Sequence, residues 1–145
     1  MKIFTIGFTK KPAAAFFGSL KEAGVSRLID VRLNNVSQLA GFTRKNDLSF
    51  FTRAICGIDY LHLPELAPTK GMLDAFRKQK GDWGIYERRF LDLIGERRIE
   101  NTLAPEVAEG ACLLCSEEKP HHCHRRLVAE YLREKWRDVE IEHLP

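Results

Sequence analysis

Two thiols, with the polar residues between and after them, form the most reactive stretch of this chain. An apolar run ends at Cys115, a polar loop follows, and Cys123-His124-Arg125 opens a segment with helical periodicity. The N-terminus of a helix carries unpaired N–H groups and a partial positive charge, to which the arginine adds a full charge. These surroundings favour a thiolate, because they lower the pKa of a nearby thiol. They would also attract a phosphate or sulfate group.

Residue chemistry suggests a role for each of these side chains. Cys115 is the candidate nucleophile or redox thiol and Cys123 a second reactive thiol, while Glu117 and His124 are candidate acid–base groups. Arg125 is a candidate anion-binding residue. A structural explanation competes with these roles: Cys115 would then be a small buried hydrophobe, and Arg125 would pair with Asp30 to tie two loops together.

The spacing of the cysteines also raises the question of a metal. Cys112-x-x-Cys115 looks like a zinc half-site, with Cys123-His124 as its complement. However, side chains three residues apart on a strand point to opposite faces, so Cys112 is better explained as a core residue. We therefore predict no four-ligand site and assign no metal or other cofactor. A three-ligand metal site made by Cys115, Cys123 and a histidine is kept as an alternative.

Strands and helices alternate along the whole chain. Apolar runs bounded by glycine or proline predict strands at 3–6, 25–31, 58–63 and 111–115, and a final strand is predicted at 139–143. Helical periodicity predicts helices from Pro12 to Gly24, from Asp47 to Gly57, from Thr69 to Gly81, and two more around 83–94 and 124–132. This order predicts a three-layer α/β/α domain with a mainly parallel sheet of about five strands. It also predicts that the first two strands, joined by a helix, form a parallel pair.

The candidate residues follow the ends of these strands. Gly7 closes the first strand, Asp30 and Arg32 end the second, and Cys115 and Glu117 end the fourth. Ligands bind at the carboxyl ends of the strands in open parallel sheets, so we expect these residues around a shared cleft. Within it, Gly7, Asp30, Arg32 and Arg125 are the expected substrate-binding residues.

Length and charge set wider limits. The 145 residues fit one domain spanning 1–145, and the net charge of +3 neither requires nor excludes a nucleic-acid partner. Neither a transmembrane stretch nor a signal peptide is evident, so we expect a cytoplasmic protein with no membrane partner. Arg44, Lys45 and Arg53 would suit a phosphate-binding surface, with Phe42 for stacking on bases.

Four segments resemble one known family. They are Thr5-Ile6-Gly7-Phe8, Leu28-Ile29-Asp30-Val31-Arg32, Gly57-Ile58-Asp59-Tyr60, and Leu114-Cys115-x-Glu117 with Cys123-His124-Arg125. Their types and order are similar to the family catalogued as domain of unknown function 488 (DUF488). The resemblance implies a site but no settled activity. Carried over motif by motif, that site comprises Asp30, Arg32, Cys115, Glu117, Cys123, His124 and Arg125.

Three functions fit these observations. The first is an enzyme acting on a small anionic substrate that is phosphorylated, nucleotide-like or sulfur-bearing. The second is a nucleic-acid-binding module, and the third is a metal-stabilised interaction domain. Salt-dependent binding to DNA or RNA would favour the second, and stoichiometric zinc the third. A thiol of low pKa without either would favour the enzyme.

Overall fold

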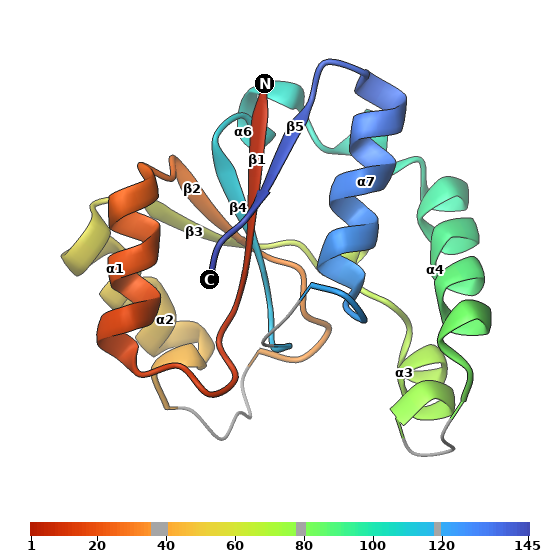
Figure 1. Cartoon of the computed structure of the whole chain (residues 1–145), viewed down its shortest axis with the longest axis horizontal. Coiled ribbons are helices and arrows are strands. Elements are labelled where there is room, and N and C mark those ends of the chain that lie inside the picture. The colour runs from red at the N-terminus through yellow and green to blue at the C-terminus, as the bar shows by residue number, and fades with distance from the viewer. Residues whose placement is uncertain (36–40, 78–80, 118–119) are drawn as a thin grey trace.

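A five-stranded parallel sheet forms the centre of the protein. The computed structural model describes residues 1–35, 41–77, 81–117 and 120–145. Within the described residues the sheet order is β3-β2-β4-β1-β5, and every neighbouring pair is parallel (Figure 1). The strands are β1 (Lys2–Gly7), β2 (Arg27–Asp30), β3 (Asp59–His62), β4 (Ala111–Cys115) and β5 (Glu140–His143).

Helices cover both faces of this sheet and complete the predicted three-layer α/β/α architecture. Figure 1 shows α1 and α2 on one side and α4 and α7 on the other. The helical segments are α1 (Ala13–Ala23), η1 (Gly41–Thr43), α2 (Lys45–Phe51), the π-helical turn η2 (Thr52–Cys56), η3 (Pro64–Leu66), α3 (Lys70–Arg77), α4 (Trp83–Arg97), α5 (Ile99–Thr102), α6 (Pro105–Ala108) and α7 (His124–Trp136). None of the described helices is both long enough and apolar enough to span a bilayer.

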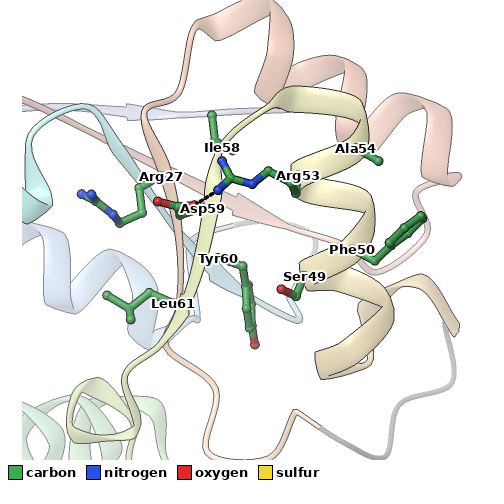
Figure 2. A pocket seen from close by; sticks show the side chains of 9 residues that line it. All are labelled: Arg27, Ser49, Phe50, Arg53, Ala54, Ile58, Asp59, Tyr60 and Leu61. Carbon is green, nitrogen blue, oxygen red and sulfur yellow. Dashed lines mark ion pairs between the residues drawn. The ribbon is translucent and has the colours of Figure 1, made fainter.

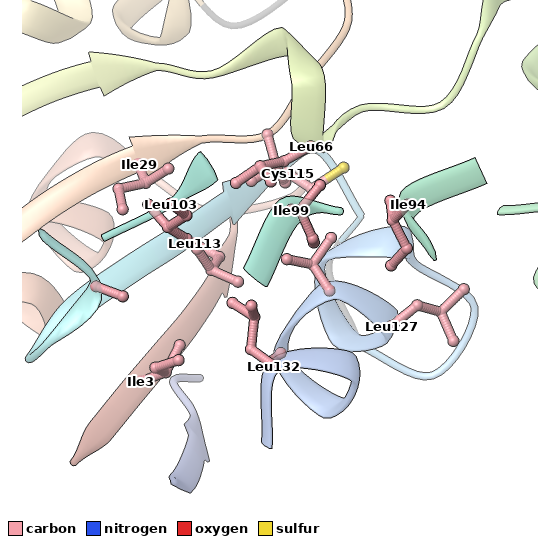
Figure 3. Packing of buried hydrophobic residues seen from close by; sticks show 14 of the residues in the cluster. Ile3, Ile29, Leu66, Ile94, Ile99, Leu103, Leu113, Cys115, Leu127 and Leu132 are labelled. Atoms are coloured by element: carbon pink, nitrogen blue, oxygen red, sulfur yellow. The ribbon is translucent and has the colours of Figure 1, made fainter. Parts of the chain in front are cut away.

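The alternation of side chains along β4 divides the core into two clusters. Cys112 packs with the apolar residues of α1, whereas Leu113 and Cys115 pack with those of α4 and α7. Figure 3 shows Cys115 at the end of β4, in the same cluster as Leu66 and Ile99. This confirms that Cys112 and Cys115 face opposite sides of the sheet, because successive strand residues point in opposite directions.

Glycines end two of the predicted helices where expected. Gly24 follows α1 with φ 71°, and Gly57 follows η2 with φ 69°; both lie in the left-handed region that glycine adopts without strain. Between α4 and β4, where the sequence predicts no element, the chain forms the short helices α5 and α6. Helices of four residues are too short to show a periodicity that could predict them.

The expected pairing of the first two strands is wrong. β1 and β2 are parallel, but β4 lies between them and pairs with both. The register places Gly7 beside Cys115 and Asp30 beside Leu114. The carboxyl ends of β1, β2 and β4 therefore lie at one edge of the sheet, as the sequence predicts.

Candidate functional site

A cavity of about 460 Å³ lies at this edge of the sheet. Three segments line it: the chain after β2, one face of α3, and the junction from β4 to α7. The lining residues are Arg32, Leu33, Asn34, Lys70, Leu73, Asp74, Arg77, Cys115, Ser116 and His124. The cavity therefore brings a thiol, an imidazole and three basic side chains to one wall.

The imidazole of His124 is oriented by a backbone carbonyl. Its Nε2 lies 2.6 Å from the carbonyl oxygen of Val31, and since a carbonyl only accepts, Nε2 must carry the proton. The Nδ1 atom, 3.6 Å from Sγ of Cys115, is then the basic nitrogen of the neutral ring. His124 is thus placed to take the proton of the Cys115 thiol.

Cys123 completes a buried group of two thiols and one imidazole. A hydrogen bond from the Cys123 thiol, with the charge of His124, lowers the pKa of Cys115 well below its ordinary value of 9.0, despite burial. Burial raises the pKa of Cys123, as does the adjacent Cys115. Burial alone would lower the pKa of His124, but the interaction with Cys115 raises it overall. Cys115 is therefore the more acidic thiol of the pair and Cys123 the less acidic one.

The same three side chains are close enough to share one metal ion. Their sulfur and nitrogen atoms lie within 4.8 Å of one another. Cys112 does not join them, because it faces the other side of the sheet. Of the metal arrangements considered from the sequence, only the three-ligand one is sterically available.

Arg32 is held at the cavity by a buried ion pair with Asp30. Its Nε and Nη2 atoms lie 2.8 and 2.7 Å from the two carboxylate oxygens of Asp30, which also accepts hydrogen bonds from the Arg32 backbone N–H and the Tyr60 hydroxyl. The Nη1 atom of Arg32 is buried without an acceptor among the described residues. Asp30 is therefore occupied in positioning Arg32, and Arg32 still has N–H groups to donate.

Arg125 and Gly7 lie outside the cavity lining. Arg125 is fully buried, and its Nη1 donates to the carbonyl oxygen of Glu117 at 2.6 Å. A Cβ atom at Gly7 would lie 1.6 Å from the same oxygen. Both residues thus hold the loop after β4 against the end of β1. The partner of Asp30 is Arg32, in place of the Arg125 considered from the sequence.

Glu117 lies at the rim, where its side chain is half-exposed. One of its carboxylate oxygens is 3.5 Å from Nη2 of Arg77, which is equally exposed. Glu117 also borders a small recess with Trp83, Tyr86 and Cys123. The structure therefore places it beside a cation, while His124 is the candidate acid–base group in contact with Cys115.

Sequence reasoning missed the contribution of α3 to the site. Lys70, Leu73 and Arg77 are spaced three and four residues apart and so share one helical face, which lines the cavity. A signal for them existed: α3 follows β3, whose carboxyl end lies at the same edge as the other strand ends. Applying the strand-end rule to β3 would have found them.

A larger cavity, of about 610 Å³, lies beside β3, α2 and η2 (Figure 2). Its charged groups already have partners in the protein: Arg53 pairs with Asp59 at 3.1 Å, and Arg27 donates to the Val107 carbonyl. The residues lining it include no thiol and no imidazole. We therefore assign the site to the smaller cavity, because volume without reactive groups does not indicate chemistry.

Phe42, the aromatic residue considered for stacking on bases, is used by the core. Its ring centroid lies 5.5 Å from that of Phe16 and 5.8 Å from that of Phe17. Phe42 therefore packs against the core and does not present the exposed ring that this form of single-stranded nucleic-acid binding requires of it.

One comparison with known proteins finds a match. The family model described as "Domain of unknown function DUF488" matches residues 12–132, a range that includes every residue lining the smaller cavity. No curated protein and no solved structure matches the chain.

Proposed function

This chain belongs to the DUF488 family, whose description assigns no activity, and from that premise we propose that it is an enzyme in which the Cys115 thiolate attacks an anionic substrate. The observation that carries the proposal is the contact between Cys115 and His124 at the wall of a cavity lined by basic side chains. A nucleophile, its base and a group orienting that base are the parts that covalent catalysis requires, and the Val31 carbonyl supplies the last.

The lining of the cavity supports an anionic substrate. Nη1 of Arg32 has no acceptor among the described residues, and an anion would satisfy it. The ion pair of Arg77 with Glu117 is half-exposed and long, so a ligand can replace the carboxylate at little cost. The volume of about 460 Å³ falls in the range of small-molecule sites.

The chemistry then follows from the positions of the two side chains. The thiolate forms a bond to an electrophilic atom of the substrate, while the His124 imidazolium lies close enough to protonate the leaving group. The Val31 carbonyl holds the imidazole in the required orientation during both steps. Arg32 and Arg77 hold the anionic part of the substrate beside the sulfur.

Alkylation with two matched reagents tests this proposal. We expect iodoacetate and iodoacetamide to label Cys115 before the other three cysteines. For Cys115, the ratio of the iodoacetate rate to the iodoacetamide rate should be roughly tenfold higher than the same ratio for a free thiol such as N-acetylcysteine. The reason is that a charge-assisted hydrogen bond to the carboxylate contributes about 1.5–3 kcal/mol. Mass spectrometry of digested protein gives both rates. Inorganic sulfate should slow the labelling by competing for the cavity.

Two arginine variants provide the comparison. Arg77→Gln should lower the iodoacetate preference by about two- to fivefold, as expected for an exposed charge. Arg53→Gln, at the larger cavity, should leave the preference unchanged. First labelling at Cys56, or a reagent ratio equal to that of the free thiol, would refute the proposed role of the cavity.

The pH dependence of alkylation gives a second prediction. Because the pKa of Cys115 is lowered, its thiolate should persist, and labelling should stay fast, at pH values well below 9.0. The rate should fall only as the pH drops through that lowered pKa. His124→Gln removes the imidazolium charge, so it should move the midpoint of the rate profile to higher pH.

His121, in the loop just before α7, serves as the control for this profile. The ring of His121 stacks on that of His122, so His121→Gln should leave the midpoint where it is in the unmodified protein. An unshifted midpoint in His124→Gln would show that His124 does not stabilise the thiolate.

A further inference from the structure

We propose that Cys123 is a second catalytic thiol, and that the site reduces small anionic disulfides by thiol–disulfide exchange. This inference rests on the proposed function, since Cys115 is again the attacking thiol. It adds a substrate class and a role for a residue that simple nucleophilic catalysis leaves unused.

The positions of the two sulfur atoms indicate which cysteine attacks the substrate and which attacks afterwards. Both cysteines are free thiols, and their sulfur atoms lie within 4.8 Å of each other. Cys115 lines the cavity of about 460 Å³, whereas Cys123 borders the small recess next to Trp83 and Tyr86. A ligand in the cavity therefore contacts the sulfur of Cys115, whereas the sulfur of Cys123 does not line that cavity.

The contact of Cys115 with His124 agrees with this order. Sγ of Cys115 lies 3.6 Å from Nδ1 of His124, which can take its proton, so Cys115 attacks first and Cys123 follows once Cys115 has been modified. The two residues that directly follow Cys115 are anchored, because Arg125 donates a hydrogen bond to the Glu117 carbonyl and Thr9 donates one to that of Ser116. The two sulfurs thus stay close through both steps.

The first step joins the protein to half of the substrate. The Cys115 thiolate attacks one sulfur of the substrate disulfide, a bond forms between the two sulfurs, and the substrate S–S bond breaks. The departing thiolate takes a proton from the His124 imidazolium and leaves as a thiol. The product is a mixed disulfide on Cys115 beside a neutral His124.

The second step releases the other half. Cys123 gives its proton to the neutral His124 and attacks Sγ of Cys115, so that a Cys115–Cys123 bond forms as the mixed disulfide breaks. The second substrate thiolate takes that proton and leaves. In total, one substrate disulfide becomes two thiols and the protein dithiol becomes a disulfide. Another turnover requires a dithiol reductant, such as dithiothreitol.

The cavity selects among substrates that a thiolate could attack. Its volume of about 460 Å³ suits a small organic molecule and greatly exceeds what a hydroperoxide such as hydrogen peroxide would fill. Arg32 and Arg77 can bind carboxylates of the substrate. Leu33 and Leu73 can contact the carbon chains that link those carboxylates to the substrate sulfur. A low-molecular-weight disulfide that carries carboxylates fits all of these features.

Glutathione disulfide is a suitable probe. Protein that has been reduced, treated with a chelator and desalted is mixed with it, and the released glutathione and the protein mass are followed. We expect two glutathiones per protein and a product two hydrogens lighter, with Cys115 linked to Cys123 in the peptide map. Cys123→Ser should release one glutathione and keep the other on Cys115. Cys56→Ser, which changes a thiol outside the site, should behave as the unmodified protein does.

The charge of the substrate is tested with uncharged and cationic disulfides. Glutathione disulfide should react about tenfold faster than 2-hydroxyethyl disulfide, from one added charge-assisted hydrogen bond. Cystamine, which is cationic, should be slower still. Equal rates for the three reagents would overturn the substrate class.

Other outcomes separate the two proposals. A stable mixed disulfide on Cys115 of the unmodified protein would overturn the role of Cys123 and leave the nucleophilic role of Cys115 standing. Failure of Cys115 to react with both glutathione disulfide and iodoacetate would overturn both. Thiols that react only after chelation, with zinc in the chelate, would identify a metal site and overturn the exchange reaction.

Discussion

Asp30→Ala should lower the free energy of unfolding by about 3–5 kcal/mol, the range expected when one partner of a buried ion pair is removed. The change leaves the Arg32 guanidinium, which is only 4% exposed, without its carboxylate. It also removes the acceptor of the Tyr60 hydroxyl. Chemical denaturation followed by circular dichroism measures the loss.

Asp59→Ala is the matched control. Asp59 also pairs with an arginine, Arg53, but the two side chains are 60% and 68% exposed. Exposed pairs contribute little, so this variant should lose less than about 1 kcal/mol. A similar loss in both variants would contradict the view that burial makes the Asp30–Arg32 pair structural.

Gly7→Ala should also destabilise the protein, by an amount at the upper end of the roughly 1–3 kcal/mol that overpacking costs. The added Cβ would lie 1.6 Å from the Glu117 carbonyl oxygen, a backbone atom, so the loop after β4 must move. Because that loop begins directly after Cys115 and supplies Ser116 to the cavity lining, alkylation of Cys115 should lose its preference for iodoacetate as well.

A second glycine-to-alanine change should have the opposite sign. Gly18 lies inside α1, and a Cβ there would meet nothing within 4 Å. Gly18→Ala should therefore raise the free energy of unfolding by roughly 0.5–1 kcal/mol, because alanine loses less conformational freedom in a helix. If both variants lost stability, close approach would not be the reason that Gly7 is required.

Local patterns predicted the elements of this fold better than their arrangement. The strands ending at Gly7, Asp30 and Cys115 follow from short apolar runs, and Gly24 marks the end of α1. The insertion of β4 between β1 and β2 could not be predicted in this way. Strand pairing depends on contacts between segments far apart in the chain, and a periodicity of two residues does not specify the neighbouring strand.

The same limit applies to the site. The strand-end rule placed Arg32 and Cys115 at one edge, and the structure brings both to one cavity with His124. It also placed Gly7 there, without showing that the glycine is pressed against a loop. Nor could the sequence show that Arg125 is fully buried and bonded to a backbone carbonyl. Those distinctions depend on burial, which residue type alone does not determine for an arginine or a glycine.

The central position of β4 also determines the order in which the strands can pair while the chain is being synthesised. Both strands that pair with β1, namely β4 and β5, lie C-terminal to residue 110. A chain leaving the ribosome can join β2 to β3 early, but β1 must wait for residues 111–115 before it enters the sheet. Those residues end in Cys115. The strand that joins β1 to β2 is therefore the one that carries Cys115, the proposed nucleophile, and this sulfur acquires its surroundings only when the fold is nearly complete.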